Sequence, residues 1–408
     1  MQGVNVIAQA GDWMAAREQL RGDPVTGGLL RRLAKGWRAL TGGSGVRDDV
    51  GTTHNQAGDS HLGRRTLLAC SGGGDSSALV LGLCAGVAKA RERFVVGHVV
   101  HDLRSSEESL TDRDRARDLA AWVGVEFVEA KVRVREDSHG AVGVDEDTNH
   151  ESRARRARYR VLAKLARAQG CGFVATAHHA DDAMETVLMR LLRGSAGVGL
   201  GGIHHTRGIG HDVVLVRPML WGDGLTRVDS EQVCAVAGFA FALDKTNADE
   251  TRLRAYLRAR VLPALRGVRS DAATRITSAG RLLAEAGRVV RARGSQLAAL
   301  GVKTRNDDVA DQAIVFDRPG LAGEERIVLG EVVRAVHTRL AKETGFGSVR
   351  GHDRLNARVL GEVGDRIKDE SMHARTMAVG HMAVTVTSRQ VRFAMRQAGT
   401  GKAKAQSE

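Results

Sequence analysis

The chain alternates short apolar runs with longer amphipathic stretches from Arg65 to about residue 220. Apolar runs of about four to eight residues predict strands, whereas apolar positions that recur every three or four residues predict helices. The predicted strands are 66–70, 94–100, 126–132, 172–177 and 213–217, and the predicted helices are 77–91, 106–122, 151–169, 180–193 and 227–237. Strands separated by helices of this length indicate βα units on a mainly parallel sheet.

The pattern changes after residue 267. Helices are predicted over 271–300, 323–342 and 351–368, and strands over 313–316, 376–379 and 384–393. Before residue 64, helical patterns occur over 12–20 and 29–40. We therefore predict an α/β fold, a mainly parallel sheet flanked by helices, followed by a smaller α+β, largely helical domain. The expected parts are a partly helical extension (1–63), the α/β domain (64–266), an accessory domain (267–397) and a disordered tail (398–408).

Composition narrows the functional class. The chain has 408 residues, 42% of them hydrophobic, which is enough for more than one core. Its formal charge of +13 favours a polyanionic partner, with nucleic acid first, although a general preference for arginine explains part of the excess. Only 3% of the residues are aromatic, which argues against base stacking as the main means of binding.

Cysteines and hydropathy exclude other classes. The four cysteines lie far apart without a C-x-x-C pair, which argues against a disulfide scaffold, a zinc ribbon or a cysteine-held cluster. No apolar run approaches the roughly 20 residues of a membrane span. The first residues also lack the basic start and apolar stretch of a signal peptide. We expect a soluble, cytoplasmic protein that makes no membrane contact.

Residues 66–77 place a glycine-rich turn between an apolar strand and a helix. Its three consecutive glycines let backbone amides converge, and the following helix adds its positive N-terminal end. Asp75 adds a carboxylate suited to Mg²⁺ beside phosphate oxygens. The turn is neither a Walker loop nor G-x-G-x-x-G. It is predicted to bind the pyrophosphate of a nucleotide; the alternative is a structural turn with a serine cap.

A second polar block runs from Thr176 to Thr186, just past a predicted strand. Its two histidines and three carboxylates can bind a metal, position a nucleophile or move protons. On the helix, Asp182 and Glu185 share a face. The block is not H-E-x-x-H, so a zinc hydrolase is not indicated. The alternative is a charged helix start in which Asp181 and Asp182 only favour the helix dipole.

Both blocks resemble a known family. Ser71–Ser76 reads Ser-Gly-Gly-x-Asp-Ser and resembles the PP-loop of N-type ATP pyrophosphatases, which attach AMP to an oxygen and release pyrophosphate. With the second block, the chain resembles the tRNA(Ile)-lysidine synthetases over about residues 64–266, and only loosely beyond. Matching positions are 190–197, 199–203, 217–220, Glu151, Ala154, Arg155, Arg158, Tyr159, Asp244, Asn247, Asp249, Arg254, Arg258, Leu262 and Pro263.

The chain departs from the family pattern at two places. The usual His-Val-Asp-His-Gly-Leu-Arg reads His-Val-Val-His-Asp-Leu-Arg here, with Val100 and Asp102 as the changes. The usual Arg-Asn-Arg-Ile-Arg reads Arg-Ala-Tyr-Leu-Arg over 254–258, so that Ala255 and Tyr256 differ. The departures put contacts to adenine or tRNA in question more than the pyrophosphate chemistry.

The resemblance implies an ATP-dependent ligase that joins free L-lysine to C2 of the wobble cytidine of tRNA(Ile) with a CAU anticodon. An adenylated cytidine is the intermediate, and the products are lysidine, AMP and pyrophosphate. It implies ATP and Mg²⁺ as cofactors, with Asp75 and Asp182 as candidate metal ligands. The catalytic candidates are Asp75, His178 and Asp182. The ATP-binding candidates are Ser71, Gly72, Gly73, Gly74, Asp75, Ser76, Arg104 and Arg155, and the tRNA-binding candidates are Arg190, Arg193, Arg254 and Arg258.

Other functions stay open from the sequence. A thiolase of the same superfamily needs well-placed thiols, which the isolated cysteines do not supply. Amidotransferases with a PP-loop lack the Arg-Leu-Leu-Arg-Gly-Ser block. A catalytically impaired RNA-binding protein on this scaffold is the third alternative. The oligomeric state, with a homodimer as one option, and the residues of the lysine pocket are not indicated.

Overall fold

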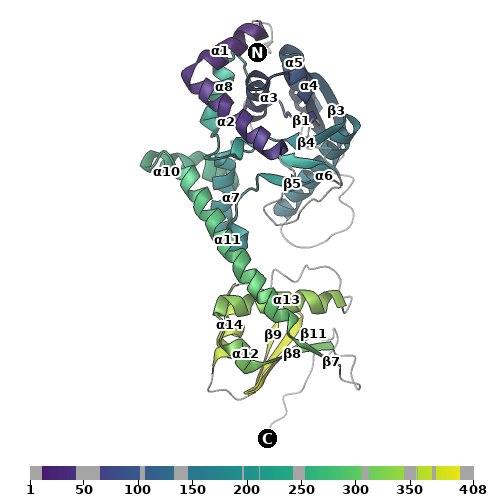
Figure 1. The fold of residues 1–408 in the computed structure, drawn as a ribbon, viewed down its shortest axis with the longest axis vertical. Coiled ribbons are helices and arrows are strands. Elements are labelled where there is room, and N and C mark those ends of the chain that lie inside the picture. Colours follow the sequence, from purple (N-terminus) through teal and green to yellow (C-terminus); the bar gives the residue numbers. More distant parts are fainter. Residues whose placement is uncertain are drawn as a thin grey trace. The chain divides into compact units, whose positions relative to one another are not determined.

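The computed structural model describes residues 12–42, 65–101, 106–132, 146–194, 197–210, 212–241, 253–305, 312–343, 355, 357–369 and 374–395. The chain divides into two compact units (Figure 1). The first comprises residues 1–189 and 201–280, and the second comprises residues 190–200 and 281–408. The boundaries of the four parts expected from the sequence remain predictions, and the tail 398–408 lies outside the described residues.

A six-stranded sheet with the order β3-β2-β1-β4-β6-β5 forms the centre of the first unit (Figure 1). Its strands are β1 (Arg65–Ala69), β2 (Phe94–His101), β3 (Glu126–Val132), β4 (Cys171–Ala175), β5 (Thr206–Gly208) and β6 (Val214–Val216). All pairs are parallel except β5 with β6. The predicted strands are confirmed to within two residues. β5 was not predicted, because three residues give no usable periodicity.

Helices cover both faces of this sheet. The helices of this unit are α1 (Trp13–Gly22), α2 (Pro24–Thr41), α3 (Gly74–Gly86), α4 (Ala90–Arg93), α5 (Ser106–Val123), α6 (Glu146–Ala168), α7 (Ala180–Leu192), α8 (Arg227–Val236), α9 (Leu253–Tyr256) and α10 (Leu262–Val268), of which the last two pack near α7 rather than on the sheet. The prediction of one helix over 77–91 was wrong. α3 ends at Gly86, and Lys89 adopts a left-handed conformation, with φ of 55°, before α4 begins.

Adjacent strand residues face opposite layers, which explains the nearly continuous apolar runs. Leu68 packs in one core with residues of α2, α3, α5 and α8. Leu67 packs in the opposite core against α6. The helices near the start of the chain belong to the first of these cores: the indole of Trp37 donates a hydrogen bond to Thr66 Oγ1 at 3.1 Å. Gly82 permits the close approach of α2 to α3, since a Cβ there would lie 2.6 Å from Leu33.

The second unit contains a five-stranded antiparallel sheet with the order β7-β8-β11-β10-β9. Its strands are β7 (Val302–Arg305), β8 (Gln312–Asp317), β9 (Arg375–Val379), β10 (Met382–Val386) and β11 (Gln390–Met395). Its helices are α12 (Arg318–Ala322), α13 (Arg326–Glu343) and α14 (Ala357–Lys368), while α11 (Ala272–Ala299) begins in the first unit. Phe316 and Phe393 meet edge to face at 5.6 Å in its core.

The expected single strand over 384–393 is instead the hairpin β10–β11. Thr387 closes the turn, because its backbone N–H donates to the carbonyl of Gln390 and its hydroxyl accepts from the N–H of that residue, both at 2.9 Å. The α+β class of this unit is confirmed, but its sheet is larger than expected. Within the described segments, no helix combines the length and the apolar character that crossing a bilayer requires.

Candidate active site

The glycine-rich turn lies at the carboxyl end of β1 and leads directly into α3. Gly72 has φ of +84°, and a Cβ there would lie 2.7 Å from the carbonyl oxygen of Asp112, so only glycine fits. Ser76 braces the turn: its hydroxyl accepts from the Ser71 N–H at 3.1 Å and donates to the Gly73 carbonyl at 2.9 Å. Gly73 caps α3 without any side-chain hydrogen bond, which leaves the first amides of the helix available to an anion.

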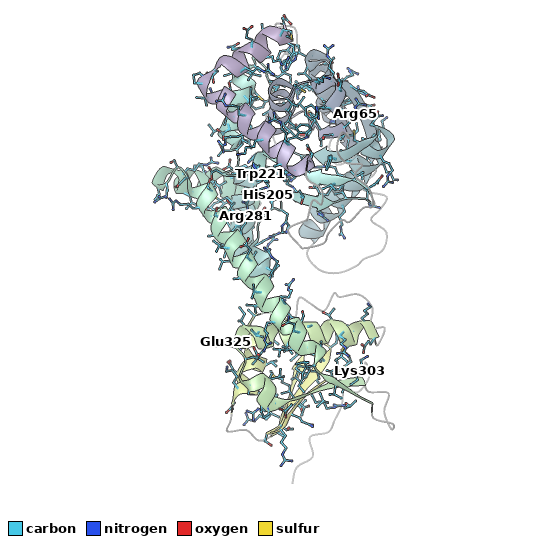
Figure 2. All side chains as sticks on the ribbon, viewed as in Figure 1. Arg65, His205, Trp221, Arg281, Lys303 and Glu325 are labelled. Carbon is cyan, nitrogen blue, oxygen red and sulfur yellow. The ribbon has the colours of Figure 1, made fainter. Side chains whose placement is uncertain are left out.

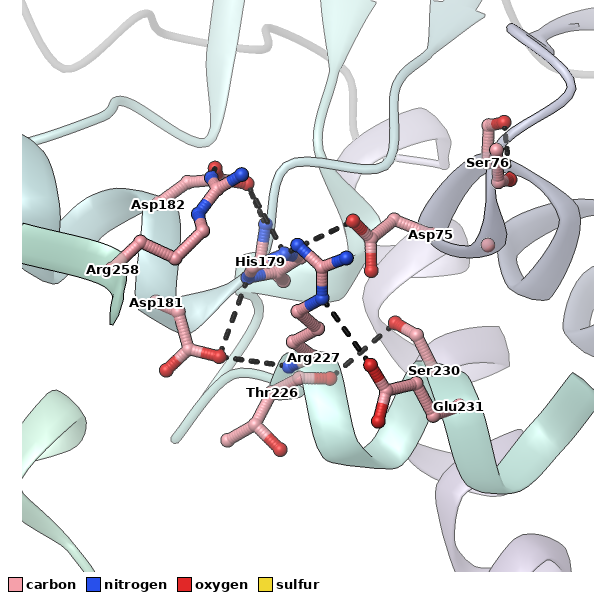
Figure 3. Close-up of polar contacts among 12 residues, drawn as sticks. Asp75, Ser76, His179, Asp181, Asp182, Thr226, Arg227, Ser230, Glu231 and Arg258 are labelled. Carbon is pink, nitrogen blue, oxygen red and sulfur yellow. Dashed lines mark hydrogen bonds and ion pairs between the residues drawn. The ribbon is translucent and has the colours of Figure 1, made fainter. Parts of the chain in front are cut away.

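The second polar block begins at the carboxyl end of β4, next to β1 in the sheet. Its His179 lies between carboxylates, as Figure 3 shows. The imidazole Nε2 is 3.4 Å from Asp75 Oδ2 and 3.5 Å from Asp182 Oδ2, and Nδ1 is 3.7 Å from Asp181 Oδ2. This imidazole therefore connects the glycine turn on α3 with the acidic start of α7.

Charge explains the state of these groups. Burial alone would lower the pKa of His179, but Asp182, Asp75 and Asp181 outweigh it and raise that pKa to about 9. Burial would raise the pKa of Asp182, but the cations His179, Arg254 and Arg258 hold it well below its ordinary value. At neutral pH the centre of the site is therefore an imidazolium among carboxylates.

Two arginines form ion pairs with the carboxylates of the acidic block. Arg254 Nε lies 2.9 Å from Glu185 Oε2, and Arg258 Nε lies 2.7 Å from Glu185 Oε1. Arg258 also reaches Asp182 Oδ1 at 3.2 Å. Arg258 lies in a π-helical turn, Leu257–Val261, between α9 and α10. Such turns are rare and concentrate at functional sites.

His178 has a different environment from His179. Its Nδ1 lies 2.9 Å from Thr176 Oγ1. Burial, followed by the positive charges of Arg217 and Arg155, lowers the pKa of His178 to about 3, so this imidazole is neutral at pH 7. The two neighbouring histidines therefore differ in charge: one is a cation held by acids, and the other is a neutral hydrogen-bonding group beside arginines.

The predicted site residues fall into three groups. Ser71, the three glycines, Asp75, Ser76, His178 and Asp182 come together at the carboxyl ends of β1 and β4. Arg155 lies on α6 and is close enough to His178 to affect its pKa. Arg104 lies outside the described residues, as do Asp102, Asp244, Asn247 and Asp249.

The arginines predicted to bind tRNA differ in their surroundings. Arg254 and Arg258 are engaged with Glu185 and Asp182, so their guanidinium groups have carboxylate partners. Arg190 donates to the Gly199 carbonyl at 2.9 Å, and Arg193 is exposed. Only Arg193 therefore presents its side chain mainly to solvent.

Sequence reasoning missed two residues that shape the site. His98 on β2 is buried, and its Nδ1 lies 2.8 Å from the Cys70 carbonyl oxygen at the start of the glycine turn. Arg217, directly after β6, is 4% exposed. Each stands in a segment that was matched to the family pattern, but a single sequence does not reveal which matched side chains turn inward.

The carboxylates differ in how well they suit Mg²⁺. Within the described ranges, no group of three or more histidines, cysteines, aspartates or glutamates is arranged to hold a metal. Asp182 has both oxygens engaged by His179, Arg254 and Arg258. Asp75 retains a side chain that is 31% exposed and stands at the mouth of the glycine turn. One such carboxylate is sufficient when substrate phosphates complete the shell, so Asp75 fits Mg²⁺ and Asp182 fits it less well.

Comparisons with known proteins place the chain in one family. Residues 49–265, more than half of the chain, match the PP-loop domain family. The chain is 35% identical over 223 residues to a tRNA(Ile)-lysidine synthase from Geobacter sulfurreducens, covering 55% of this chain and 45% of that protein. It is 39% identical to one from Deinococcus deserti, covering 50% and 34%, and 35% identical to one from Methylobacterium nodulans, covering 67% and 74%. The chain thus spans less than half the length of the first two relatives.

Proposed function

We propose that this chain, which belongs to the tRNA(Ile)-lysidine synthase family of PP-loop proteins, joins free L-lysine to C2 of the wobble cytidine of a tRNA(Ile) with a CAU anticodon. The observation that carries the proposal is the contact between the two blocks. Asp75 of the glycine turn and Asp182 of α7 both approach one imidazole, that of His179, at adjacent strand ends. A nucleotide bound by the turn then has its phosphates beside the acidic block.

The first step uses the glycine turn. The C2 oxygen of cytidine attacks the α-phosphorus of ATP, an oxygen–phosphorus bond forms, the bond to the β-phosphate bridge breaks, and pyrophosphate leaves. The free amides at the start of α3 stabilise the charge that develops on the leaving pyrophosphate. When bound, Mg²⁺ would be held by Asp75 and would neutralise phosphate charge. We assign ATP binding to Ser71–Ser76 and Arg155, with Arg104 as a further candidate from the sequence.

The second step uses the acidic block. The side-chain ammonium of lysine releases a proton to solvent, and the resulting amine attacks C2; the carbon–nitrogen bond forms, the carbon–oxygen bond breaks, and AMP leaves. Carboxylates attract the ammonium group of the incoming lysine, and Asp182 is our candidate for this contact. The low pKa of His178 makes its imidazole a hydrogen-bonding group rather than a strong base. We therefore assign His178 the task of orienting a substrate oxygen.

In this proposal, the positive charge of the protein attracts tRNA. The formal charge of +13 supplies attraction to the phosphate backbone. Arg193 is exposed and suited to a phosphate contact, and Arg190 lies three positions before it in sequence. Arg254 and Arg258 are better suited to holding Glu185 and Asp182 in place than to direct contact with RNA.

The cysteines argue against the thiolase alternative. All four cysteines are buried. Burial raises the pKa of Cys84 and Cys234 to about 12 and that of Cys171 to about 11, and it raises the pKa of Cys70 as well. A protonated, buried thiol is a poor sulfur carrier, because the thiolate is the reactive form.

The proposal is tested by nucleotide and lysine turnover on defined tRNA. Full-length protein is mixed with ATP, Mg²⁺, radiolabelled lysine and a tRNA(Ile) transcript that carries a CAU anticodon. AMP and pyrophosphate should form in equal amounts with the lysine bound to tRNA. A transcript with uridine in place of the wobble cytidine is the matched control and should accept no lysine. AMP formation that ignores lysine, or labelling of the control transcript, contradicts the proposed function.

A further inference from the structure

Arg217 is a buried cation whose guanidinium is only partly satisfied. The residue is 4% exposed, its Nη1 donates to the His204 carbonyl at 2.6 Å, and its Nε is buried without a hydrogen-bond partner. The side chain of Tyr159 is a further hydrogen-bond partner of the guanidinium. Among the described residues, the ionisable groups that act most strongly on Arg217 are Tyr159, Arg155 and Arg207, none of which is a carboxylate. Burial, with the nearby Arg155 and Arg207, lowers the pKa of Arg217.

The backbone places Arg217 at the carboxyl end of β6, next to the acidic block at the carboxyl end of β4. In the β4–β6 pair, Ala175 lies opposite Val216, and the Thr176 N–H donates to the Val216 carbonyl at 3.1 Å. Arg217 is therefore the position next to Thr176, whose hydroxyl contacts His178. The Arg217 N–H donates in turn to the His205 carbonyl at 2.9 Å.

The segment around Arg217 is also held by aromatic packing. The rings of His205 and Trp221, both labelled in Figure 2, meet edge to face at 5.8 Å. Trp221 packs against Gly36 of α2, where a Cβ would lie 2.6 Å from the Trp221 Cβ. Arg217 therefore stands on a fixed frame rather than on a free loop, as a binding group requires.

An arginine buried without a carboxylate is expected to have an anionic partner, since an unpaired buried charge is costly. A planar guanidinium fork matches a carboxylate or a phosphate, and both would satisfy the free Nε. The order of the strands distinguishes between a carboxylate and a phosphate as the ligand of Arg217. The glycine turn follows β1, the acidic block follows β4, and Arg217 follows β6, so that the acidic block stands between the phosphate site and the arginine.

We propose that Arg217 binds the α-carboxylate of the amino-acid substrate. Lysine carries its side-chain ammonium at one end and its α-carboxylate at the other, so it matches an acidic block that has a cationic group close by. In the proposed function, the phosphates of ATP are already assigned to the glycine turn, two strands away from Arg217, and to Arg155. This inference rests on the proposed function, because it assumes that an amino acid is the second substrate.

Removal of the carboxylate from the ligand and of the guanidinium from the protein tests the contact. The ligands are lysine and cadaverine, which is lysine without its carboxyl group. The proteins are the full-length chain, R217Q and the matched control R167Q, whose arginine pairs with Asp212 on the surface. In the wild type and in R167Q, kcat/KM for lysine should exceed that for cadaverine by about a hundredfold, as expected for a buried charge contact. In R217Q this ratio should fall to about fivefold or less.

The outcomes distinguish a wrong assignment of Arg217 from a wrong proposed function. An R217Q ratio equal to that of the wild type overturns the carboxylate assignment. A higher KM for ATP or tRNA with an unchanged ratio also overturns it and indicates a phosphate ligand instead. If circular dichroism shows that R217Q is unfolded, R217M replaces it, since methionine keeps an unbranched side chain without the charge, and an unchanged ratio in R217M has the same meaning. A wild-type protein that forms no AMP with lysine and tRNA contradicts the proposed function itself, whereas the other outcomes leave that function standing.

Discussion

Asp75 is the residue at which the two blocks of the site meet. Its carboxylate contacts His179, and it stands on the first turn of α3 beside the amides that face the predicted phosphates. We expect Asp75→Asn to reduce kcat for pyrophosphate release by at least about a hundredfold, since a charge placed for the transition state is lost. Release of labelled pyrophosphate in the presence of tRNA measures the effect.

Glu231→Gln is the matched control for Asp75→Asn. Glu231 is a nearby acid, also drawn in Figure 3, but its side chain is 49% exposed and pairs with Arg227 at 3.3 Å. Exposed pairs of this kind contribute little, so its turnover should change less than about threefold. Full turnover in Asp75→Asn would show that Asp75 is not required for the reaction.

The buried imidazole of His98, which contacts the start of the glycine turn, makes the stability of the protein depend on pH. Burial lowers its pKa in the folded protein below the ordinary 6.5, so the unfolded chain binds this proton first as the pH falls. The stability linked to His98 is therefore present above about pH 6.5 and is lost below it. We expect His98→Asn, which keeps a donor for the Cys70 carbonyl, to lessen the pH dependence of the unfolding free energy between pH 6.5 and 5. The reduction should reach up to about 1.4 kcal/mol per pH unit.

Denaturant unfolding at several pH values measures this slope. His381→Asn is the control, since His381 lies exposed in the turn between β9 and β10. Its slope should equal that of the wild type. An equally steep slope in His98→Asn shows that the buried imidazole does not set the pH dependence.

At the residue scale, the sequence identified the composition of the site but not its geometry. The pair His178-His179 was recognised, and His178 was chosen as the catalytic candidate. The structure places His179, not His178, between the carboxylates. A sequence pattern cannot distinguish between two adjacent histidines. The backbone conformation after β4 determines which of them points toward Asp75. The catalytic roles remain predictions.

Among the elements, α7 and the π-helical turn are joined by ion pairs of Arg258 with Glu185 and Asp182. Glu185 is fully buried, and Arg258 is 25% exposed and 2.7 Å away. Glu185→Gln leaves Arg254 and Arg258 without their shared carboxylate, so it should cost about 3–5 kcal/mol of unfolding free energy. Arg258→Gln should cost less, because Arg254 still pairs with Glu185. In the double variant the losses should fall short of additive by about 1–3 kcal/mol, as measured by denaturant unfolding.

The pair Arg358–Glu362 on α14 is the control for this cycle. It has the same charges at 3.0 Å, but its side chains are 88% and 47% exposed. Its coupling energy should stay below about 1 kcal/mol. Additive losses at Glu185 and Arg258 would mean that the two elements do not support each other through this contact.

Long elements with strong periodicity could be predicted, and short or irregular ones could not. α5 was predicted to within one residue, because its amphipathic pattern extends over many turns. β7 and the π-helical turn were missed. β7 has four residues, and a π turn differs from an α turn only in its hydrogen bonding, which leaves no mark in the apolar pattern.

On the scale of the whole molecule, charge should govern the interaction with RNA. With a formal charge of +13, tRNA binding should release counterions, so that the logarithm of the affinity falls with that of the salt concentration. We expect Kd for tRNA to rise roughly tenfold to a hundredfold between about 50 and 200 mM salt, which corresponds to about two to four neutralised phosphates. Filter binding at several salt concentrations measures the slope. A Kd that is insensitive to salt would exclude phosphate contacts as the main source of affinity.

The fold class was predictable because alternating strands and helices leave few ways to build a parallel sheet. Because each block follows a predicted strand of a parallel sheet, both are expected at the carboxyl ends of the strands, where ligands bind in such folds. The second unit was less predictable. Its strands pair antiparallel between segments as distant as β8 and β11, and no local pattern indicates which partner a strand takes.

In the proposed function, the amides after β1 hold the phosphates of ATP beside Asp75 and His179. A crystal structure with Mg²⁺ and an ATP analogue whose α–β bridge is a methylene group tests it most directly. We predict that the β- and γ-phosphates accept hydrogen bonds from the amides of residues 72–76, with the α-phosphate facing the acidic block. A triphosphate bound elsewhere, without contact to either block, would contradict the account.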